Sequence, residues 1–443
     1  MNPYAAPQAV DTQTPRRFPP IDPASGLWTY AWLVVLVLWP VALLNYLDRQ
    51  MLAAMKSSVM ADIPDIAREA NWGYMLGQFK WVYAFFSPLG GYLADRFSRR
   101  WTICGSLFVW SGVTWATGQV TTYDGLLWTR TWMGISEAFY IPAALALIAD
   151  YHSGGTRSRA IGLHQTAIYC GIILGGFGGY VADAPDWGWR SAFDICGMAG
   201  LLYAVPLWLM LRDKPRSPSA ATTESALSSG SGAPSIGQTL RELLGNGSFL
   251  LLVACFTLPA LAGWVVKDWM PAILKDKFMI GQGLAGVSAT LYVNLAALVG
   301  VFAGGWLADG WMRQNIRGRI YVSALGMTLL IPALFGVGNA DTLLLAILFL
   351  VVFGVGWGFF DCNNMPILTQ IVRPGLRASG YGIMNLVSIS CGGLADWGFG
   401  ELRDRQVPLN LIFGVFGAVA LLSVGLVLLI KPQPEQSAGP PEH

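Results

Sequence analysis

Gly90-Gly91-Tyr92-Leu93-Ala94-Asp95 recurs almost unchanged as Gly304-Gly305-Trp306-Leu307-Ala308-Asp309, 214 residues further along a chain of 443. Each copy closes an apolar segment and is followed by several arginines. A spacing close to half the chain predicts two halves of similar architecture. Within the first copy, we expect Gly91 to allow close approach of a neighbouring helix and Asp95 to cap and pair at a helix junction.

The composition is that of a polytopic membrane protein. Apolar residues make up 54% of the chain and charged residues only 12%, where a soluble domain carries about 25% charged residues. Length and hydropathy predict an all-α fold with twelve transmembrane helices in two six-helix pseudo-repeats. The predicted spans are residues 28–55, 74–95, 101–120, 124–149, 158–182, 190–211, 248–273, 281–308, 318–338, 341–366, 377–397 and 407–430.

Between the two predicted groups of six lies a segment that is rich in Ser, Ala, Gly and Pro and unsuited to packing. The expected organisation is a tail at 1–27, a six-helix bundle at 28–211, a linker at 212–247, a second bundle at 248–430 and a tail at 431–443. With both tails on the cytoplasmic side, the segments on that side hold 17 of the 28 Lys and Arg residues and the other side holds 7. This asymmetry predicts cytoplasmic termini.

Several classes of function are excluded by the polar residues. The six cysteines lie in apolar segments without a CxxC pair, and only three histidines occur, so we expect neither a disulfide framework nor a metal site. No basic cluster interleaved with aromatic residues indicates nucleic-acid binding. No pattern of a nucleophile with its base is present, so we expect no catalytic residue, no enzyme activity and no cofactor.

Four charged residues inside or next to predicted spans are the main candidates for functional residues. Asp48 and Arg49 follow the uncharged run 28–47, and they lie either at the outer membrane surface or in the protein interior. Arg130 and Glu137 are seven residues apart in the fourth span, on nearly the same helix face and about 10 Å apart along its axis. Glu137 is either one partner of a structural ion pair or a titratable carboxylate facing a polar cavity.

Short motifs occur along most of the chain. They are Asn45-Tyr46-Leu47-Asp48-Arg49, the arginine-rich loop after Asp95, Arg130-x-x-x-Gly134-x-x-Glu137-Ala138, Arg159-Ala160-Ile161-Gly162-Leu163, Gly188-Trp189-Arg190 and Gly382-Ile383-Met384-Asn385. Together they resemble the anion:cation symporter family of the major facilitator superfamily. The resemblance implies the twelve-helix fold, and it favours an interior position for Asp48 and Arg49.

The resemblance also implies roles for individual residues. Asp48 and Glu137, together with Arg130, are expected to take part in proton coupling. Arg49 is expected to bind a carboxylate of the substrate. Four further polar residues are expected to line the cavity, namely Tyr46, Tyr83, Gln165 and Asn385. Gating of the inner face is expected of Gly91, Asp95, Arg96, Arg100 and Asp309.

Three features leave alternatives open, and the first two of them depart from the family pattern. Lys80 is a candidate substrate ligand, or else it snorkels to the outer interface. Lys267 and Asp268 either face the cavity or lie near a helix end. Asn364, which precedes Pro366, belongs either to a broken helix that binds a ligand or to a structural helix contact.

The expected function is secondary active transport of a small organic anion, a sugar acid or another carboxylate, together with protons. We expect a monomer in the inner or plasma membrane that works by alternating access. The alternative is a spinster-like carrier of lysolipids or sphingolipids, which shares the Asn45–Arg49 segment and fits the Arg130–Tyr140 pattern equally well. Gln165 and Asn385 favour a hydrophilic cargo over a lipid.

Overall fold

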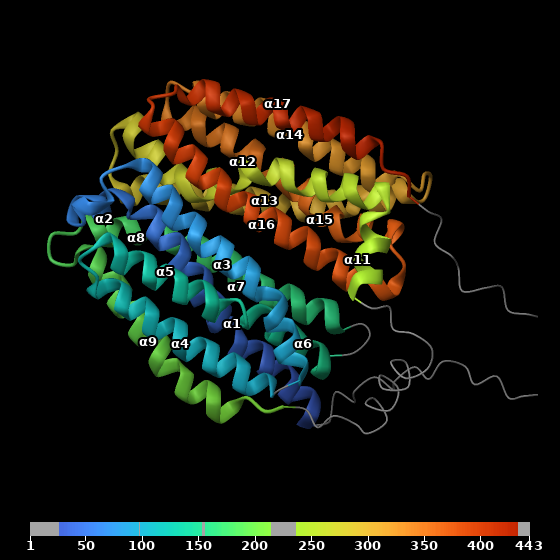
Figure 1. Cartoon of the computed structure of the whole chain (residues 1–443), viewed down its shortest axis with the longest axis horizontal. Coiled ribbons are helices and arrows are strands. Elements are labelled where there is room, and N and C mark those ends of the chain that lie inside the picture. The colour runs from blue at the N-terminus through green and yellow to red at the C-terminus, as the bar shows by residue number, and fades with distance from the viewer. Residues whose placement is uncertain (1–25, 97, 153–155, 214–235, 433–443) are drawn as a thin grey trace, which may run out of the picture.

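The computed structural model describes residues 26–96, 98–152, 156–213 and 236–432, with the backbone alone for residues 91–96. The long elements of this part of the chain are all α-helices (Figure 1). The first half contains α1 (Gly26–Ala54), α3 (Glu69–Arg96), α4 (Arg99–Gln119), α5 (Tyr123–Glu137), α6 (Tyr140–Tyr151), α7 (Arg157–Gly176), α8 (Gly178–Asp183) and α9 (Gly188–Met210). The second half contains α12 (Gly247–Phe278), α13 (Gln282–Met312), α14 (Gly318–Asn339), α15 (Leu343–Ile371), α16 (Arg377–Asp404) and α17 (Leu409–Leu428).

The predicted all-α transmembrane fold is confirmed, and every predicted span coincides with one helix or with two helices in succession. Within the described residues, nine spans are apolar and long enough to cross a membrane by composition alone. The three spans outside this set are formed by α3, α4 and α16. Short elements that the sequence analysis did not predict are α2 (Lys56–Asp62), α11 (Ile236–Leu244) and the 3₁₀ turns Pro64–Ile66 and Pro374–Leu376.

Two spans that the sequence predicted as single helices are interrupted. The fourth span breaks between Glu137, where α5 ends, and Tyr140, where α6 begins. Pro142 lies four residues after Ala138 and has no N–H to donate to the Ala138 carbonyl. The backbone hydrogen bond that would continue the helix is therefore missing at this point. The break places Glu137 at the end of α5 inside the bundle. The fifth span similarly divides into α7 and α8 at Phe177.

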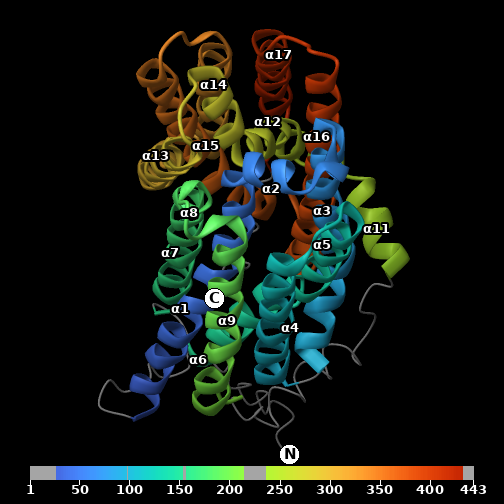
Figure 2. The same cartoon turned by 90° about the vertical axis from the view of Figure 1, so that its left-hand side faces the viewer.

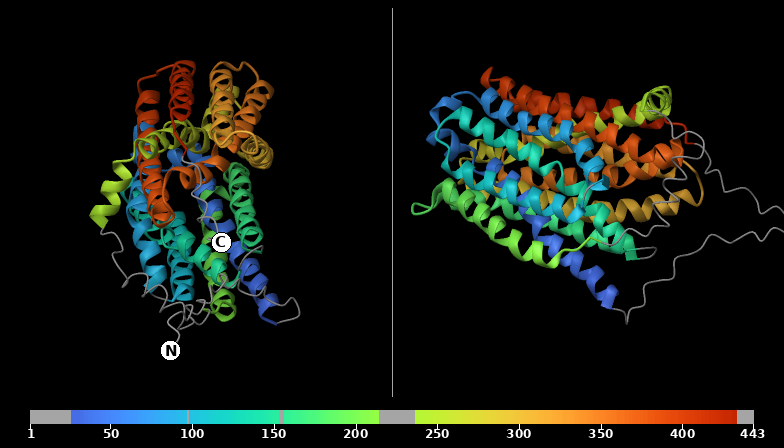
Figure 3. Two further views of the ribbon diagram at one scale, coloured as in Figure 1. Left: turned by 90° about the vertical axis from the view of Figure 1, so that its right-hand side faces the viewer. Right: turned by 60° about the horizontal axis from the view of Figure 1, so that its bottom comes forward.

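The two groups of helices form two bundles that lie side by side, the first coloured blue to green and the second yellow to red (Figures 2 and 3). Inside the first bundle, α1 packs on α7, and inside the second, α15 packs on α13 and α14. The Gly171 and Gly175 positions on α7 face the α1 backbone, where an added Cβ would collide with the carbonyls of Leu43 and Leu47. These two glycines therefore allow α1 and α7 to approach closely.

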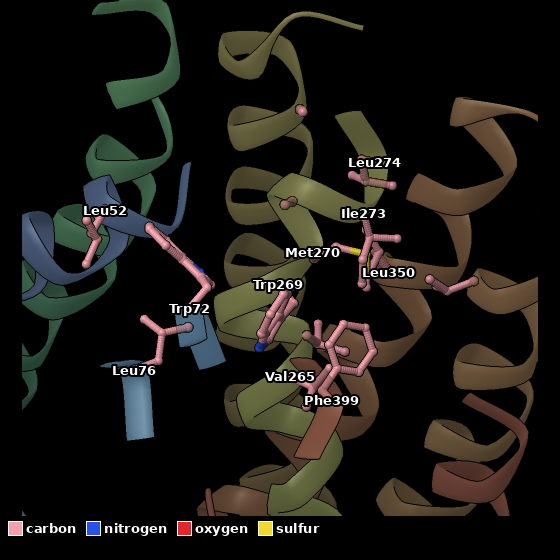
Figure 4. Packing of buried hydrophobic residues seen from close by; sticks show 14 of the residues in the cluster. Leu52, Trp72, Leu76, Val265, Trp269, Met270, Ile273, Leu274, Leu350 and Phe399 are labelled. Atoms are coloured by element: carbon pink, nitrogen blue, oxygen red, sulfur yellow. The ribbon is translucent and has the colours of Figure 1, made fainter. Parts of the chain in front are cut away.

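The bundles meet most closely along α3 of the first half and α16 of the second. A buried apolar cluster joins them: Trp72 and Leu76 come from α3, while Trp269 and Phe399 come from α12 and α16 (Figure 4). The rings of Trp269 and Phe399 have centroids 4.9 Å apart. We call the end of the molecule with α2 and α8 the α2 end, and the opposite end the α11 end (Figure 1).

Candidate functional site

Arg49 on α1 and Glu137 at the end of α5 form the centre of the candidate site. The Nε of Arg49 donates to Oε2 of Glu137 at 2.5 Å, and its Nη2 contacts the same oxygen. Nη2 also donates to Oδ1 of Asn45 at 3.2 Å. The Glu137 side chain is fully buried, whereas 15% of the Arg49 side chain is exposed. The guanidinium is therefore paired inside the bundle and still accessible to another group.

Three aromatic rings surround the Arg49 guanidinium. Its Cζ lies 4.7 Å from the ring centroid of Phe79 and 5.0 Å from those of Tyr46 and Tyr83. A cation within about 6 Å of a ring face is attracted by the ring quadrupole. The rings consequently fix the guanidinium without using up its N–H donors, and two of them bring a phenolic hydroxyl with them.

Asp48 and Arg130 lie behind this centre and are both 2% exposed. Oδ2 of Asp48 accepts a hydrogen bond from Thr114 Oγ1 at 2.9 Å, and Nη2 of Arg130 donates to Thr117 Oγ1 at 3.0 Å. The interpretation that places Asp48 at the outer membrane surface is wrong, because α1 continues to Ala54 and its side chain is buried. Two buried acids and two arginines thus balance one another between α1 and α5.

The second half contributes a cation, Lys267, whose position the sequence alone does not decide. Nζ of Lys267 on α12 lies 5.2 Å from the ring centroid of Tyr46, and equally far from that of Trp264. Among the described residues, no carboxylate oxygen lies within ion-pair distance of this ammonium. The alternative that puts Lys267 near a helix end is wrong, since α12 continues to Phe278. The Tyr46 ring is therefore close to one cation of each half.

The remaining predicted cavity residues are spread over other helices. Gln165 is exposed on α7, Asn385 is half-buried on α16, and Asn364 is buried on α15. No hydrogen bond among the described residues connects them with Arg49. Of the two alternatives for Asn364, the broken helix is wrong, because α15 runs unbroken through Pro366. Asp361, one turn before Asn364, is exposed.

Lys80 has a different environment from the one that we expected. Its ammonium is buried, with 5% of the side chain exposed, so it does not snorkel to the membrane interface. It donates to Oδ2 of Asp268 at 2.5 Å and to Oδ2 of Asp396. Both partners come from the second half of the chain, so Lys80 joins the halves and does not point a free ammonium at a substrate.

A surface cavity of about 460 Å³ lies elsewhere, at the α2 end of the second half. It is lined by the ends of α12, α14 and α16 and by the start of α17, including Asp276, Lys277 and Arg403. None of the predicted site residues lines it. The candidate site is therefore the group of charged residues around Arg49, namely Asp48, Arg49, Arg130 and Glu137, and not this cavity.

Residues 38–395 match the family described as Major Facilitator Superfamily, which is most of the chain. The chain belongs to the Major Facilitator Superfamily. Protein spinster homolog 1 of Rattus norvegicus is 31% identical over 329 residues, a match that spans 69% of this chain and 60% of that protein's length. A protein of Bacillus subtilis (strain 168) named "Probable galactarate/D-glucarate transporter GudP" is 27% identical over 312 residues, covering 66% of each chain.

Solved structures show the same fold. A bacterial homologue of the human lysosomal transporter spinster, described as inward-facing and occupied, superimposes with a TM-score of 0.75 at 20% identity. The superposition covers 90% of this chain and 97% of that one. The major facilitator fold and the many apolar helices make this chain a multi-pass membrane protein, and its relatives are transporters and not enzymes.

The two expected gating residues whose side chains the structure describes, Arg100 and Asp309, contact helices of their own half. Arg100 stacks on Trp208 of α9 at 4.2 Å and donates to the Trp208 carbonyl. Asp309 accepts a hydrogen bond from Arg319 at 3.1 Å. The side chains of Gly91, Asp95 and Arg96 lie outside the part of the chain that the structure describes.

Sequence reasoning missed Asp396, whose buried carboxylate is a partner of Lys80. A signal was present, because Asp396 lies in the apolar span predicted at 377–397. Phe79 and Thr114 were also missed. They are ordinary residues of a membrane helix, and only the folded arrangement places them beside Arg49 and Asp48.

Proposed function

We propose that this protein is a proton-coupled symporter of a small organic anion. The observation that carries the proposal is the Arg49 guanidinium, which is paired with buried Glu137, enclosed by aromatic rings and still partly exposed. A planar guanidinium suits bidentate binding of a carboxylate, and the hydroxyls of Tyr46 and Tyr83 suit a polyhydroxylated acid. Gln165, Asn385 and Asn364 remain candidate ligands for the other end of the substrate.

Competition for Arg49 provides the coupling. An incoming anion has to share Arg49 with Glu137, and adding a proton to Glu137 removes this competitor. Asp48 is the second carboxylate available for a proton, with Arg130 balancing the pair electrostatically. Anion and proton therefore favour each other's binding, which is the thermodynamic requirement for symport.

Lys267 supports an anion with two carboxylates. Because Arg49 and Lys267 each lie about 5 Å from the Tyr46 ring centroid, the two cations are at most about 10 Å apart. A dicarboxylate of suitable length reaches both, one from each half of the protein. The name of the Bacillus subtilis relative, which specifies a sugar diacid, agrees with this substrate class.

The second candidate function is the lipid transport that the resemblance to spinster-like carriers implies. It is favoured by the 31% identity to the Rattus norvegicus protein and by the TM-score of 0.75 to the bacterial spinster homologue. In that case Arg49 and Lys267 would bind the phosphate of a lysolipid or sphingolipid headgroup. The partly exposed, polar surroundings of Arg49 suit both cargoes, so the experiment has to separate them.

We further propose that the protein lies in the inner or plasma membrane as a monomer with both termini in the cytoplasm. The distribution of Lys and Arg, 17 against 7, supports this orientation. The α2 end then faces the outside, and the halves are in contact on that side. In this orientation the state described here is closed on the outer side.

Uptake by the purified protein in liposomes under an inward proton gradient tests the proposal. The panel pairs labelled galactarate, D-glucarate and small monocarboxylates with a lysophospholipid and a sphingoid base. We compare the wild type with Arg49→Ala and Arg49→Lys, and use Arg405→Ala as the matched control because the Arg405 side chain is 70% exposed. Recovery of folded protein is checked for each variant by size-exclusion chromatography.

Proton-dependent accumulation of an acid is expected in the wild type and in Arg405→Ala. It should be lost in Arg49→Ala and strongly weakened in Arg49→Lys, since an ammonium does not offer the paired donors of a guanidinium. Lipid movement without acid uptake would overturn the symport proposal in favour of the lipid carrier. Acid uptake that survives Arg49→Ala would refute the assigned site.

A further inference from the structure

Lys80, Asp268 and Asp396 form a buried cluster of charges, which we call the Lys80 cluster. The Lys80 ammonium donates to Oδ2 of Asp268 at 2.5 Å and to Oδ2 of Asp396, and it lies 4.3 Å from the ring centroid of Trp264. The exposed fractions of Lys80, Asp268 and Asp396 are 4%, 8% and 0%. The ammonium of the neighbouring Lys267 lies 5.2 Å from the centroid of the same Trp264 ring and 5.2 Å from that of Tyr46.

The Lys80 cluster spans the boundary between the halves. Lys80 lies on α3 of the first half, whereas Asp268 and Asp396 lie on α12 and α16 of the second. Glycines bring α3 and α16 into backbone contact here. An added Cβ at Gly73 would collide with the Asp396 carbonyl, and one at Gly77 would lie 2.8 Å from the Gly393 carbonyl. The ion pairs are therefore held in a tight helix crossing.

Further polar contacts between the halves continue from this cluster towards the α2 end. The backbone N–H groups of Glu69 and Ala70 donate to the Asp404 carboxylate, each at 2.9 Å. Arg68 pairs with Glu401 at 3.1 Å. Near the other edge of the interface, Gln282 on α13 donates to Asp183, which ends α8, at 2.8 Å.

At the α11 end, polar contacts among the described residues stay within one half. Arg319 pairs with Asp309 in the second half, and Arg100 donates its backbone N–H to Asp213 in the first. The halves are thus joined from the middle of the bundle to the α2 end. The Lys80 cluster is the most deeply buried set of ion pairs in that joint.

If the two halves separate at the α2 end, the ion pairs of the Lys80 cluster have to break. Moving α3 away from α16 leaves an ammonium on the first half and two carboxylates on the second. Separating buried, paired charges is unfavourable unless water or another partner replaces the lost contacts. We propose that the Lys80 cluster is an ionic clamp that holds the α2 end closed and has to break in every transport cycle.

The clamp makes a prediction about the resting distribution of states, independent of the substrate proposed above. Without Lys80 the halves lose their buried ionic contact but keep the apolar cluster around Trp269. The protein should then populate the state that is open at the α2 end much more often. Asp396→Asn should have a smaller effect, because the pair between Lys80 and Asp268 remains.

Distances between spin labels, measured by double electron–electron resonance without substrate, test this. One label pair joins the halves at the α2 end, at the exposed positions Asp124 and Asp341, and a second joins them at the α11 end, at Ser158 and Gln314. The full chain is used in nanodiscs, with its six native cysteines replaced. The variants are Lys80→Met, Asp396→Asn and the charge exchange Lys80→Asp with Asp396→Lys.

Arg190→Gln is the matched control, because Arg190 pairs with Asp62 at 2.8 Å near the α2 end but within the first half. We expect the population with long distances at the α2 end to rise at least tenfold in Lys80→Met, with shorter distances at the α11 end. The charge exchange should restore the wild-type distribution, and the control should not alter it.

Wild-type distributions in both Lys80→Met and Asp396→Asn would overturn the clamp. If Lys80→Met does not fold, Asp396→Asn decides, since its side chain has nearly the same volume. An unchanged Asp396→Asn distribution then counts against the proposal. A charge exchange that leaves the α2 end open would show that the pairing itself is not what closes it.

Discussion

Replacing Glu137 with glutamine tests the competition for Arg49 most directly. The Arg49 guanidinium uses Nε and Nη2 on one oxygen of Glu137, whose side chain has no exposed surface. Glutamine preserves the volume and one acceptor but removes the charge and the ability to bind a proton. We expect Glu137→Gln to lose proton-driven accumulation of the anion while it still binds the anion and exchanges it across the membrane.

The same change should cost stability by a predictable amount. Removing one partner of a buried ion pair costs about 3–5 kcal/mol. The lower end applies here, because 15% of the Arg49 side chain is exposed and the substituted glutamine would still accept a hydrogen bond. We therefore expect the free energy of unfolding to fall by about 3 kcal/mol.

A matched control comes from a second ion pair of the first half. Asp62 pairs with Arg190 at 2.8 Å, and the exposed fractions of the two side chains are 49% and 31%. Partly exposed pairs contribute no more than about 1 kcal/mol, so Asp62→Asn should be far milder than Glu137→Gln. Steric trapping in bicelles measures both unfolding free energies on the intact chain.

Liposome assays separate the two activities of the Glu137→Gln variant. Accumulation is measured under an inward proton gradient, and exchange is measured as counterflow with the same unlabelled anion inside and no gradient. The expected result is counterflow without accumulation. Accumulation equal to that of the wild type would refute the role of Glu137 in coupling, whatever its effect on stability.

Three further predictions follow from single contacts. Lys267→Met should weaken binding of dicarboxylates more than of monocarboxylates, as measured by calorimetry; equal losses would contradict a second carboxylate site. Gly175→Ala should destabilise the protein by about 1–3 kcal/mol, because its Cβ would lie 2.6 Å from the Leu47 carbonyl, whereas Gly162→Ala has open space and serves as control. Burial lowers the pKa of His152 below its ordinary 6.5. Unfolding therefore takes up a proton below about pH 6.5, so the melting temperature should fall on acidification, and less so in His152→Asn; equal falls would exclude this cause.

The positions of the helices could be predicted from the sequence because lipid imposes a simple rule. Each crossing needs about 20 apolar residues with satisfied backbone groups, and this pattern is visible without any tertiary contact. The break between α5 and α6 was not predicted. Pro142 marked it, but prolines also occur inside unbroken helices of this protein, such as Pro88 in α3 and Pro366 in α15.

The candidate site was predictable only in part. Asp48, Arg49, Arg130 and Glu137 stand out because charge inside an apolar span is rare. Which charges pair is a different question, since it depends on how helices far apart in sequence are rotated against one another. The sequence therefore could not show that Lys80 pairs across the halves, even though it marked the residue as unusual.

The arrangement of these charges connects the site with the clamp. Arg49 and Gln50 are neighbours on α1, and Gln50 donates to the backbone carbonyl of Lys267 at 3.0 Å. Lys267 and Asp268 are in turn neighbours on α12, so the proposed ligand for an anion and the partner of Lys80 belong to one helix segment. A dianion drawn between Arg49 and Lys267 would pull this segment towards α1, and the pairing of Asp268 with Lys80 would have to adjust. Substrate binding and closure at the α2 end would then be coupled through a single turn of α12.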